Sequence, residues 1–361
     1  MNIEQGISIC DFRREKIKFC FLSHYNKLFE ILRYFQSDLL EGLVFRLSLK
    51  GAGGKKAKNQ YFKQLIISLL IILFFSFSAT AQDTGFPDTW GRWKTRIVLT
   101  AENLGPNALP VPEIRNGLVN EAAFFSLSGN YHFSDYDKTY CPDFKFSLPL
   151  ANGRVALEVW SPFVEWFEAD SLSLLERKAR NLTPTGYSGG DVYVATLIQV
   201  LKNHEFLPDM LVSISLKTAS GNNLEQLRHT DTPGYYFDLS LGKNFSVSEK
   251  LNVRPFGLIG FYVYQTHQVM ALQNDALLWG GGVAFSTPRV DISGNVGGYR
   301  GYFNQGDRPV VARISSKVKI LKNVSGTLNF QKGLNDFPFN SVSIGVKYLF
   351  FNSKANLIEN D

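Results

Sequence analysis

Cysteine and histidine are scarce in this chain, and their scarcity removes several classes of site. Cys10 and Cys20 precede the apolar run at residues 65–77, and Cys141 is the only cysteine after it, so the chain beyond that run has no partner for an internal disulfide. The four histidines after the run do not lie at metal-ligand spacing from a second histidine or a carboxylate. The sequence therefore predicts no metal site and no cofactor.

An excess of charge of one sign is also lacking beyond residue 81. The chain of 361 residues carries a formal net charge of +6. Residues 1–81 hold 12 of its 38 Lys and Arg residues and 6 of its 32 Asp and Glu residues, which leaves 26 of each sign in the remainder. A neutral chain lacks the basic surface that binds a polyanion, so we expect no nucleic-acid partner.

No hydrophobic run reaches the roughly 20 residues that a membrane-spanning helix needs. The run at residues 65–77 has 13 residues, follows the basic stretch at residues 55–63 and precedes Ala79-Thr80-Ala81. These are the three parts of a secretory signal peptide. We expect a signal peptide at residues 55–81 that is cleaved after Ala81, with an uncleaved membrane anchor as the alternative.

Residues 1–54 do not fit this arrangement, because a signal peptide begins close to the start of translation. No Met lies between Met1 and Met210, so an internal Met start is excluded. Our interpretation is that translation starts near Leu47 or Leu49 at a non-AUG codon. Residues 1–54 would then be a leader of doubtful reality, arising from a mis-assigned start.

Beyond Gln82, apolar and polar side chains alternate with a period of two. In residues 341–350, Val342, Ile344, Val346, Tyr348 and Phe350 share one face of an extended chain, and Ser and Gly side chains with one Lys occupy the other. The same alternation recurs at residues 144–148, 154–159, 212–217, 235–242, 290–298, 310–320 and 324–331. Short turns at residues 151–153, 286–288 and 321–323 separate several of these segments.

Several of these segments have about ten residues, the length of a transmembrane strand, whereas strands of soluble proteins centre on about five or six. The polar faces are rich in Ser, Gly and Asn, as expected for a hydrated lumen. We predict an all-β fold, an antiparallel transmembrane β-barrel of about 12 strands at residues 82–351, followed by a polar tail at residues 352–361. A soluble secreted sandwich or barrel is the alternative.

Barrels of this kind carry aromatic girdles, long outer loops and short periplasmic turns. The long polar stretches at residues 104–117, 168–189, 220–232 and 267–275 are the predicted outer loops, and Asn152-Gly153 and Asn323 the predicted periplasmic turns. The predicted aromatic residues at strand ends or on apolar faces are Trp160, Tyr235, Tyr262, Tyr264, Trp279, Tyr299, Tyr302 and Tyr348.

The last strand carries a more specific pattern. Ser343, Gly345, Tyr348 and Phe350 follow the order polar-x-Gly-x-x-aromatic-x-aromatic, which resembles the terminal-strand signal by which outer-membrane barrels are recognised for assembly. An edge strand offers unpaired backbone groups that another sheet captures. We therefore expect the outer membrane as location, with its lipid and the barrel-assembly machinery as partners.

The polar faces carry both signs of charge. One interpretation is a lumen that selects or conducts polar or anionic solutes. The other is an ion-pair network that fills and stabilises a narrow barrel, and the sequence leaves both open. The candidate lumen-lining residues are Lys145, Arg154, Glu158, Asp191, Lys217, Asp238, Asp291, Arg313, Lys317, Lys319 and Lys347.

One group of residues is considered as a catalytic site. His132, Ser134 and Asp135 are the one trio that suggests a nucleophile with a base. No Gly-x-Ser-x-Gly elbow accompanies them, so we predict no catalytic residues and no enzyme. The glycine runs at residues 280–282 and 297–298 indicate kinks or close backbone approach in a curved sheet.

In the middle fifth of the mature chain, Gly190-Asp191 opens one segment, Lys217 to Gly221 closes the next, and Gly234-Tyr235 forms a strand entry. With these features the chain resembles the meta-pathway phenol-degradation family of outer-membrane proteins. The resemblance implies an outer-membrane barrel that passes hydrophobic or aromatic compounds. We therefore predict a monomeric or loosely oligomeric passive channel or uptake protein for a small-molecule solute, with a lipid-modifying enzyme or a structural or adhesive barrel as alternatives.

Overall fold

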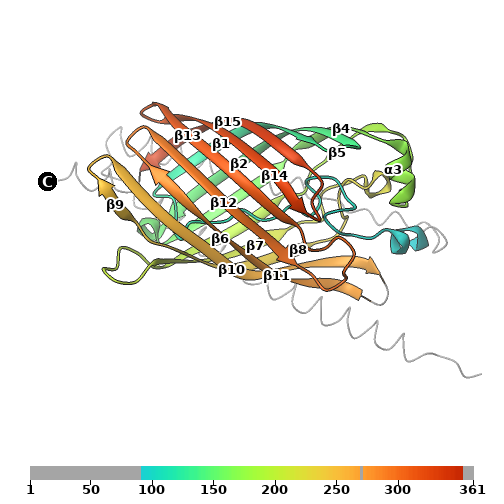
Figure 1. Cartoon of the computed structure of the whole chain (residues 1–361), viewed down its shortest axis with the longest axis horizontal. Helices are drawn as coiled ribbons and strands as arrows, with labels where there is room; N and C mark the ends of the chain where they lie inside the picture. Colours follow the sequence, from blue (N-terminus) through green and yellow to red (C-terminus); the bar gives the residue numbers. More distant parts are fainter. Residues whose placement is uncertain (1–90, 269–270, 353–361) are drawn as a thin grey trace, which may run out of the picture. The chain divides into compact units, whose positions relative to one another are not determined.

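The computed structural model describes residues 91–268 and 271–352, and their strands form one antiparallel sheet (Figure 1). The helices in these residues are η1 Gly91–Arg96, η2 Ala151–Gly153, α3 Ser171–Glu176 and η3 Leu224–Gln226. The strands are β1 Ala122–Phe133, β2 Asp137–Leu150, β3 Val155–Pro162, β4 Val164–Ala169, β5 Thr185–Gly189, β6 Tyr193–Leu201, β7 Asp209–Lys217, β8 Gly234–Gly242, β9 Phe245–Ser248, β10 Leu251–Gln268, β11 Ala271–Ser286, β12 Val290–Arg300, β13 Val310–Leu321, β14 Val324–Asn335 and β15 Asn340–Asn352.

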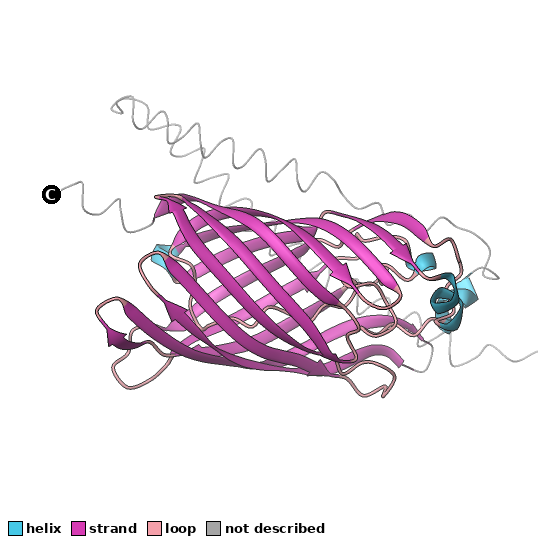
Figure 2. Cartoon of the chain, turned by 45° about the horizontal axis from the view of Figure 1, so that its top comes forward, coloured by secondary structure: helices cyan, strands magenta, loops and turns pink. Residues whose placement is uncertain are grey.

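The sheet closes on itself because β1 pairs with both β2 and β15 (Figure 2). β2 pairs with β3 along one half of its length and with β4 along the other, and β3 and β4 pair in turn with β6 and β5. β3 with β4, and β5 with β6, therefore each act as one long strand. With the short β9 set beside β10, the barrel has twelve strands, and the predicted fold class is confirmed.

The alternation seen in the sequence sorts side chains between the two faces of the wall. In β15, Ile344 is 67% exposed on the outside, whereas its neighbour Ser343 is 9% exposed and faces inward. The exposed apolar side chains continue around the barrel, for example Ile314, Leu328 and Phe261. An apolar outer wall around a polar interior is the arrangement of a transmembrane barrel and the reverse of a soluble one.

The two ends of the barrel differ. We call the end where β1 begins and β15 finishes the inner end, and the opposite end the outer end. The turns at residues 151–154, 287–289 and 322–323 are short and lie at the inner end, whereas the loops at residues 170–184, 218–233 and 301–309 lie at the outer end. Short turns at the periplasmic side and long loops outside are typical of bacterial barrels.

Two of the predicted outer loops need correction at this level. Residues 267–275 are mostly strand, because β10 continues to Gln268 and β11 begins at Ala271. The 168–189 stretch keeps a loop with the short helix α3, but β4 and β5 occupy its two ends. No helix in the described stretches is long and apolar enough to cross a membrane. The predicted leader, signal peptide and cleavage point lie outside the described residues, as does the tail beyond residue 352.

Candidate functional site

The interior of the barrel is occupied by the chain itself. Residues 97–119, here called the lumen segment, run from the outer end to the inner end before β1 begins. Their apolar side chains are buried, among them Leu104, Leu109 and Ile114. The prediction of an outer loop at residues 104–117 is therefore wrong. The segment has no strand period because inward side chains of the wall, rather than a neighbouring strand, satisfy much of its backbone.

Side chains of the wall hold the backbone of the lumen segment along its length. Tyr299 Oη donates to the carbonyl of Leu109 at 3.0 Å. Arg313 donates to the carbonyls of Val111 and Pro112 at 2.6 and 2.9 Å. Nearer the inner end, Arg254 Nε donates to the Asn116 carbonyl at 2.9 Å, and Gln199 accepts from Val119 and donates to Gly117. Each of these bonds fixes the segment against the wall.

Aromatic side chains close the outer half of the interior around the lumen segment. Tyr262, Tyr264 and Tyr299 are each about 1% exposed and contact one another edge-on or tilted, with ring centroids 5.1 to 6.4 Å apart. Trp160 also faces inward and stacks on Tyr193. The prediction places Trp160, Tyr262, Tyr264 and Tyr299 near strand ends or on apolar faces. The apolar-face placement is wrong for these four, because their strand positions point into the barrel. Tyr235, Trp279, Tyr302 and Tyr348 are exposed.

The 218–233 loop carries Arg228 into the barrel. Its guanidinium lies 2.6 Å from Asp137 and 3.1 Å from Glu165 and stacks over the ring of Phe167. Burial opposes the charge, but Glu165 and Asp137 hold the pKa of Arg228 above its ordinary value. A β-carbon at Gly105 would lie 2.7 Å from the Arg228 guanidinium carbon, so the lumen segment packs directly on this cation.

Two residues predicted to line the lumen belong to the same buried network. Lys217 Nζ lies 2.8 Å from Asp191, and neither side chain is exposed. His229 sits between Asp191 and Glu165, with nitrogen–oxygen distances of 3.5 and 3.6 Å. At this level the inward charges form a closed ion-pair network instead of lining open space.

The inner half of the interior is different. Arg115 of the lumen segment pairs with the buried Glu158 at 2.9 Å, and Lys145 lies 3.3 Å from the same carboxylate. Lys145 also pairs at 2.7 Å with Glu113, whose side chain is 67% exposed although its neighbours on both sides are buried against the wall. An exposed carboxylate between buried neighbours marks solvent-accessible space inside the inner half.

The remaining candidate residues occupy separate places. Asp238 is buried on β8 and accepts from Ser240 at 2.7 Å. Asp291 pairs with Lys317 at 2.6 Å, with both side chains partly exposed. Arg154 is exposed at the turn before β3, and Lys319 is exposed near the end of β13, whereas Lys347 is half-buried beside the Phe124 ring.

The His132, Ser134 and Asp135 trio does not assemble. His132 faces inward and its Nδ1 lies 2.7 Å from Ser341 Oγ, a partner 209 residues away that no local motif indicates. The hydroxyl of Ser134 contacts the Asp137 carbonyl instead. Within the described residues, no group of three His, Cys, Asp or Glu side chains is placed to hold a metal ion.

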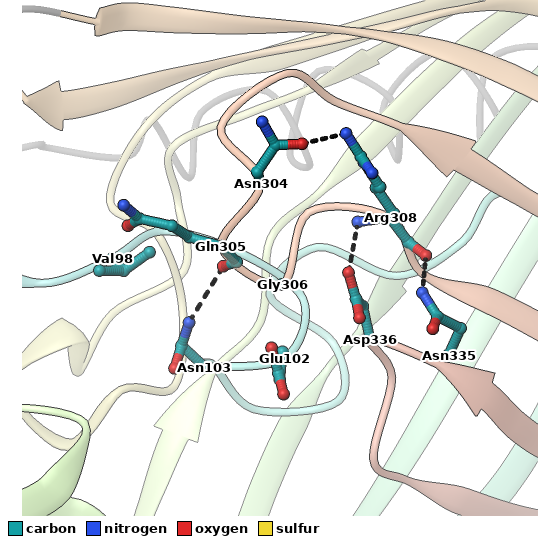
Figure 3. A pocket seen from close by; sticks show the side chains of 9 residues that line it. All are labelled: Val98, Glu102, Asn103, Asn304, Gln305, Gly306, Arg308, Asn335 and Asp336. Atoms are coloured by element: carbon teal, nitrogen blue, oxygen red, sulfur yellow. Dashed lines mark hydrogen bonds between the residues drawn. The ribbon is translucent and has the colours of Figure 1, made fainter.

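A polar pocket of about 540 Å³ lies at the outer end of the lumen segment (Figure 3). Glu102 and Asn103 of the segment form one side, and the Asn103 amide donates to the Gln305 carbonyl at 3.5 Å. Opposite them, the Arg308 backbone N–H donates to Asp336 at 3.0 Å. Burial, and then the charge of Asp336, raise the pKa of Glu102. The pocket lies between the segment and the loops that follow β12 and β14.

No family model matches the chain, and none of the curated proteins matches it. An outer membrane channel from Pseudomonas putida F1 is similar at 13% identity over 68% of this chain and 97% of that chain, with a TM-score of 0.45. The KdgM porin aligns at 13% identity over 63% and 99% of the two chains, with a TM-score of 0.40. The CymD monoaromatic hydrocarbon channel aligns at 8% identity over 71% and 100%, with a TM-score of 0.35. All three TM-scores lie below 0.5.

Proposed function

We propose that this protein is a passive outer-membrane channel for small solutes, closed in the present structure by its own lumen segment. The observation that carries the proposal is the contrast between the two halves of the interior. Tyr262, Tyr264 and Tyr299 pack around the segment in the outer half, whereas Glu113 and Lys145 border solvent-accessible space in the inner half.

The contacts that hold the lumen segment suit a gate. Beside buried apolar contacts, they include side-chain hydrogen bonds and ion pairs, such as Arg115 with Glu158 and Asn107 with Glu165 at 2.7 Å. The wall strands are held by their own continuous ladders, so movement of the segment leaves the barrel intact. Displacing it would join the inner space to the outer end.

The solute class follows from two sources. The resemblance to the meta-pathway phenol-degradation family implies hydrophobic or aromatic compounds, and the tyrosines of the outer half would offer such compounds a π-rich surface. The polar wall of the inner half suits small polar solutes. The channel would accordingly serve small molecules, with the lipid of the outer membrane around it.

A reversible lock tests the proposal. A β-carbon at Gly280 would lie 2.9 Å from Cγ1 of Ile114, the atom that the sulfur of a cysteine at position 114 would replace, so cysteines at these two positions would lie within reach of a disulfide. The Ile114→Cys/Gly280→Cys variant is placed in a Cys141→Ser background, since Cys141 is a free buried thiol. Planar-bilayer recordings should show openings in the Cys141→Ser parent, none in the oxidised double variant, and their return on reduction. Equal conductance in the oxidised and reduced forms would mean that the segment is not the gate, and a silent parent would count against a channel.

A further inference from the structure

Lysine and serine alternate along one row of the inner wall. In the register of the barrel, Ser126 of β1 stands opposite both Lys145 of β2 and Lys347 of β15. Ser325 of β14 stands opposite both Lys347 and Lys319 of β13. Adjacent strands are about 4.8 Å apart, so successive lysines of this row are about 10 Å apart. All five positions have inward parity: exposed apolar side chains such as Leu127, Val318 and Val346 stand at adjacent positions, and Ser325 itself is buried.

A cavity of about 220 Å³ opens beside this row at the inner end. It is lined by the last residues before β1 and by the inner faces of β13, β14 and β15, with Lys317, Ser325 and Lys347 among them. Ammonium and hydroxyl groups are donors, and two ammonium groups in one cavity favour an anionic guest. The cavity is large enough for a phosphate or a small carboxylate.

The positive charge of the cavity is only partly neutralised by the protein. Lys317 pairs with Asp291 at 2.6 Å. Lys347 instead lies over the ring of Phe124, 3.5 Å from its centroid, and no Asp or Glu of the described residues lies within ion-pair distance of its ammonium group. Glu121 also borders the cavity, but its carboxylate pairs with Lys202 at 3.0 Å. The cavity therefore holds a half-buried cation without a carboxylate partner.

A purely structural role for Lys347 explains its surroundings less well than anion binding does. Lysines that only stabilise a barrel wall pair with carboxylates of neighbouring strands, as Lys145 does with Glu158 and Lys217 with Asp191. Lys347 departs from that pattern at the place where the interior opens. Lipid headgroups do not reach this site, because the row faces the interior and the apolar face of the same strands looks outward.

We propose that Lys347, with Lys317 and Ser325, forms a binding site for a small free oxyanion, a phosphate or a carboxylate, at the inner mouth of the lumen. The proposal deepens the channel function proposed above and rests on it for its biological sense. Anions would concentrate at this mouth, and the open channel would favour anions over cations. The lysine ammonium acts as a point charge, so the site selects for charge and size more than for shape.

Two measurements on the full chain test the site, one of them independent of conduction. The first is the shift in unfolding midpoint of the detergent-solubilised protein with increasing inorganic phosphate, with acetate as the carboxylate probe and chloride at equal ionic strength as the reference. Lys347→Gln should weaken the phosphate dependence about tenfold, and Lys347→Arg should retain it. Lys322→Gln, which removes an exposed lysine from the neighbouring turn, is the matched control and should behave as the parent.

The second measurement is the reversal potential in a salt gradient across a planar bilayer. The parent should be anion-selective and Lys347→Gln should lose that preference, whereas Lys322→Gln should keep it. If Lys347→Gln loses the phosphate dependence, the site is upheld, whether or not the protein conducts. If no variant conducts, the channel proposal alone fails. Conducting protein with the same reversal potential and the same phosphate dependence in Lys347→Gln overturns the site. A Lys347→Gln protein that does not refold is replaced by the comparison of Lys347→Arg and Lys317→Gln: phosphate dependence kept in the first and reduced in the second upholds the site, and any other result overturns it.

Discussion

Ile114 occupies the place where Gly280 lacks a side chain. A β-carbon on Gly280 would lie 2.5 Å from Cδ1 of Ile114, and Gly280 stands directly opposite Gly297 on the next strand. The two glycines leave a slot in the inner wall that the isoleucine of the lumen segment fills.

Filling this slot should release the lumen segment. Gly280→Val places a side chain where Ile114 now lies, and overpacking of this kind typically costs about 1–3 kcal/mol. The ratio of open to closed channels should rise about tenfold, which single-channel recording measures. Ile114→Ala/Gly280→Val restores the room and should return the ratio toward that of the parent. An unchanged open fraction in Gly280→Val with a properly folded barrel would contradict this account of the slot.

Removing Arg115 alone should destabilise the protein more than removing both Arg115 and the charge of Glu158. Arg115→Met leaves Glu158 buried beside Lys145 alone, and the loss of one partner of a buried pair costs about 3–5 kcal/mol. We expect a loss near the lower end of that range, since Lys145 still lies 3.3 Å away. Arg115→Met/Glu158→Gln removes both charges and should recover most of the lost stability in denaturant titrations. Equal losses in the single and double variants would contradict the pairing.

Arg228 should be the most sensitive cation of the outer half. Arg228→Met leaves Asp137 and Glu165 buried without their partner, and should lower the free energy of unfolding by about 3–5 kcal/mol. The control is Lys94→Gln, which removes a partly exposed pair with Asp231 at 2.6 Å and should cost no more than about 1 kcal/mol. Denaturant titration of the three proteins gives both differences, and similar losses in the two variants would be inconsistent with the buried network.

The terminal-strand pattern predicts an effect on assembly rather than on stability. Tyr348 and Phe350 are exposed on the outer face of β15, with ring centroids 5.0 Å apart. Phe350→Ala and Tyr348→Ala should each reduce the amount of heat-modifiable barrel in the outer membrane several-fold. Ile344→Ala removes a still more exposed apolar side chain from the same strand outside the pattern and should assemble normally. Refolding in detergent should proceed in all three, which separates recognition from folding.

The sequence predicted the wall of the barrel well, because each wall strand has one apolar and one polar face. The period of two places Ile344 outside and Ser343 inside without any knowledge of their partners. The strand number followed from counting such segments. The predicted assembly pattern and the roles of the lumen-lining residues stay predictions, since the positions of their side chains alone do not establish what they do.

The interior was harder to predict because its contacts are not periodic. Residues 104–117 contain Pro, Gly and Asn and look like an exposed loop, and nothing local shows that Arg115 has Glu158 as its partner. Tyr262 and Tyr264 are of the residue type that forms aromatic girdles, but they occupy positions of β10 whose side chains face the interior. The available clue was the apolar content of the stretch. It holds Leu104, Leu109, Val111 and Ile114, which is more apolar side chains than a solvated loop usually carries.

The direction of the lumen segment has a topological consequence. Twelve strands and one internal passage carry the polypeptide across the height of the barrel thirteen times, an odd number, so Lys94 and Phe350 emerge at opposite ends. β1 and β15 close the wall around a stretch of chain that runs through the lumen. A wall closed without that passage would be an empty tube with residues 91–119 left at one end.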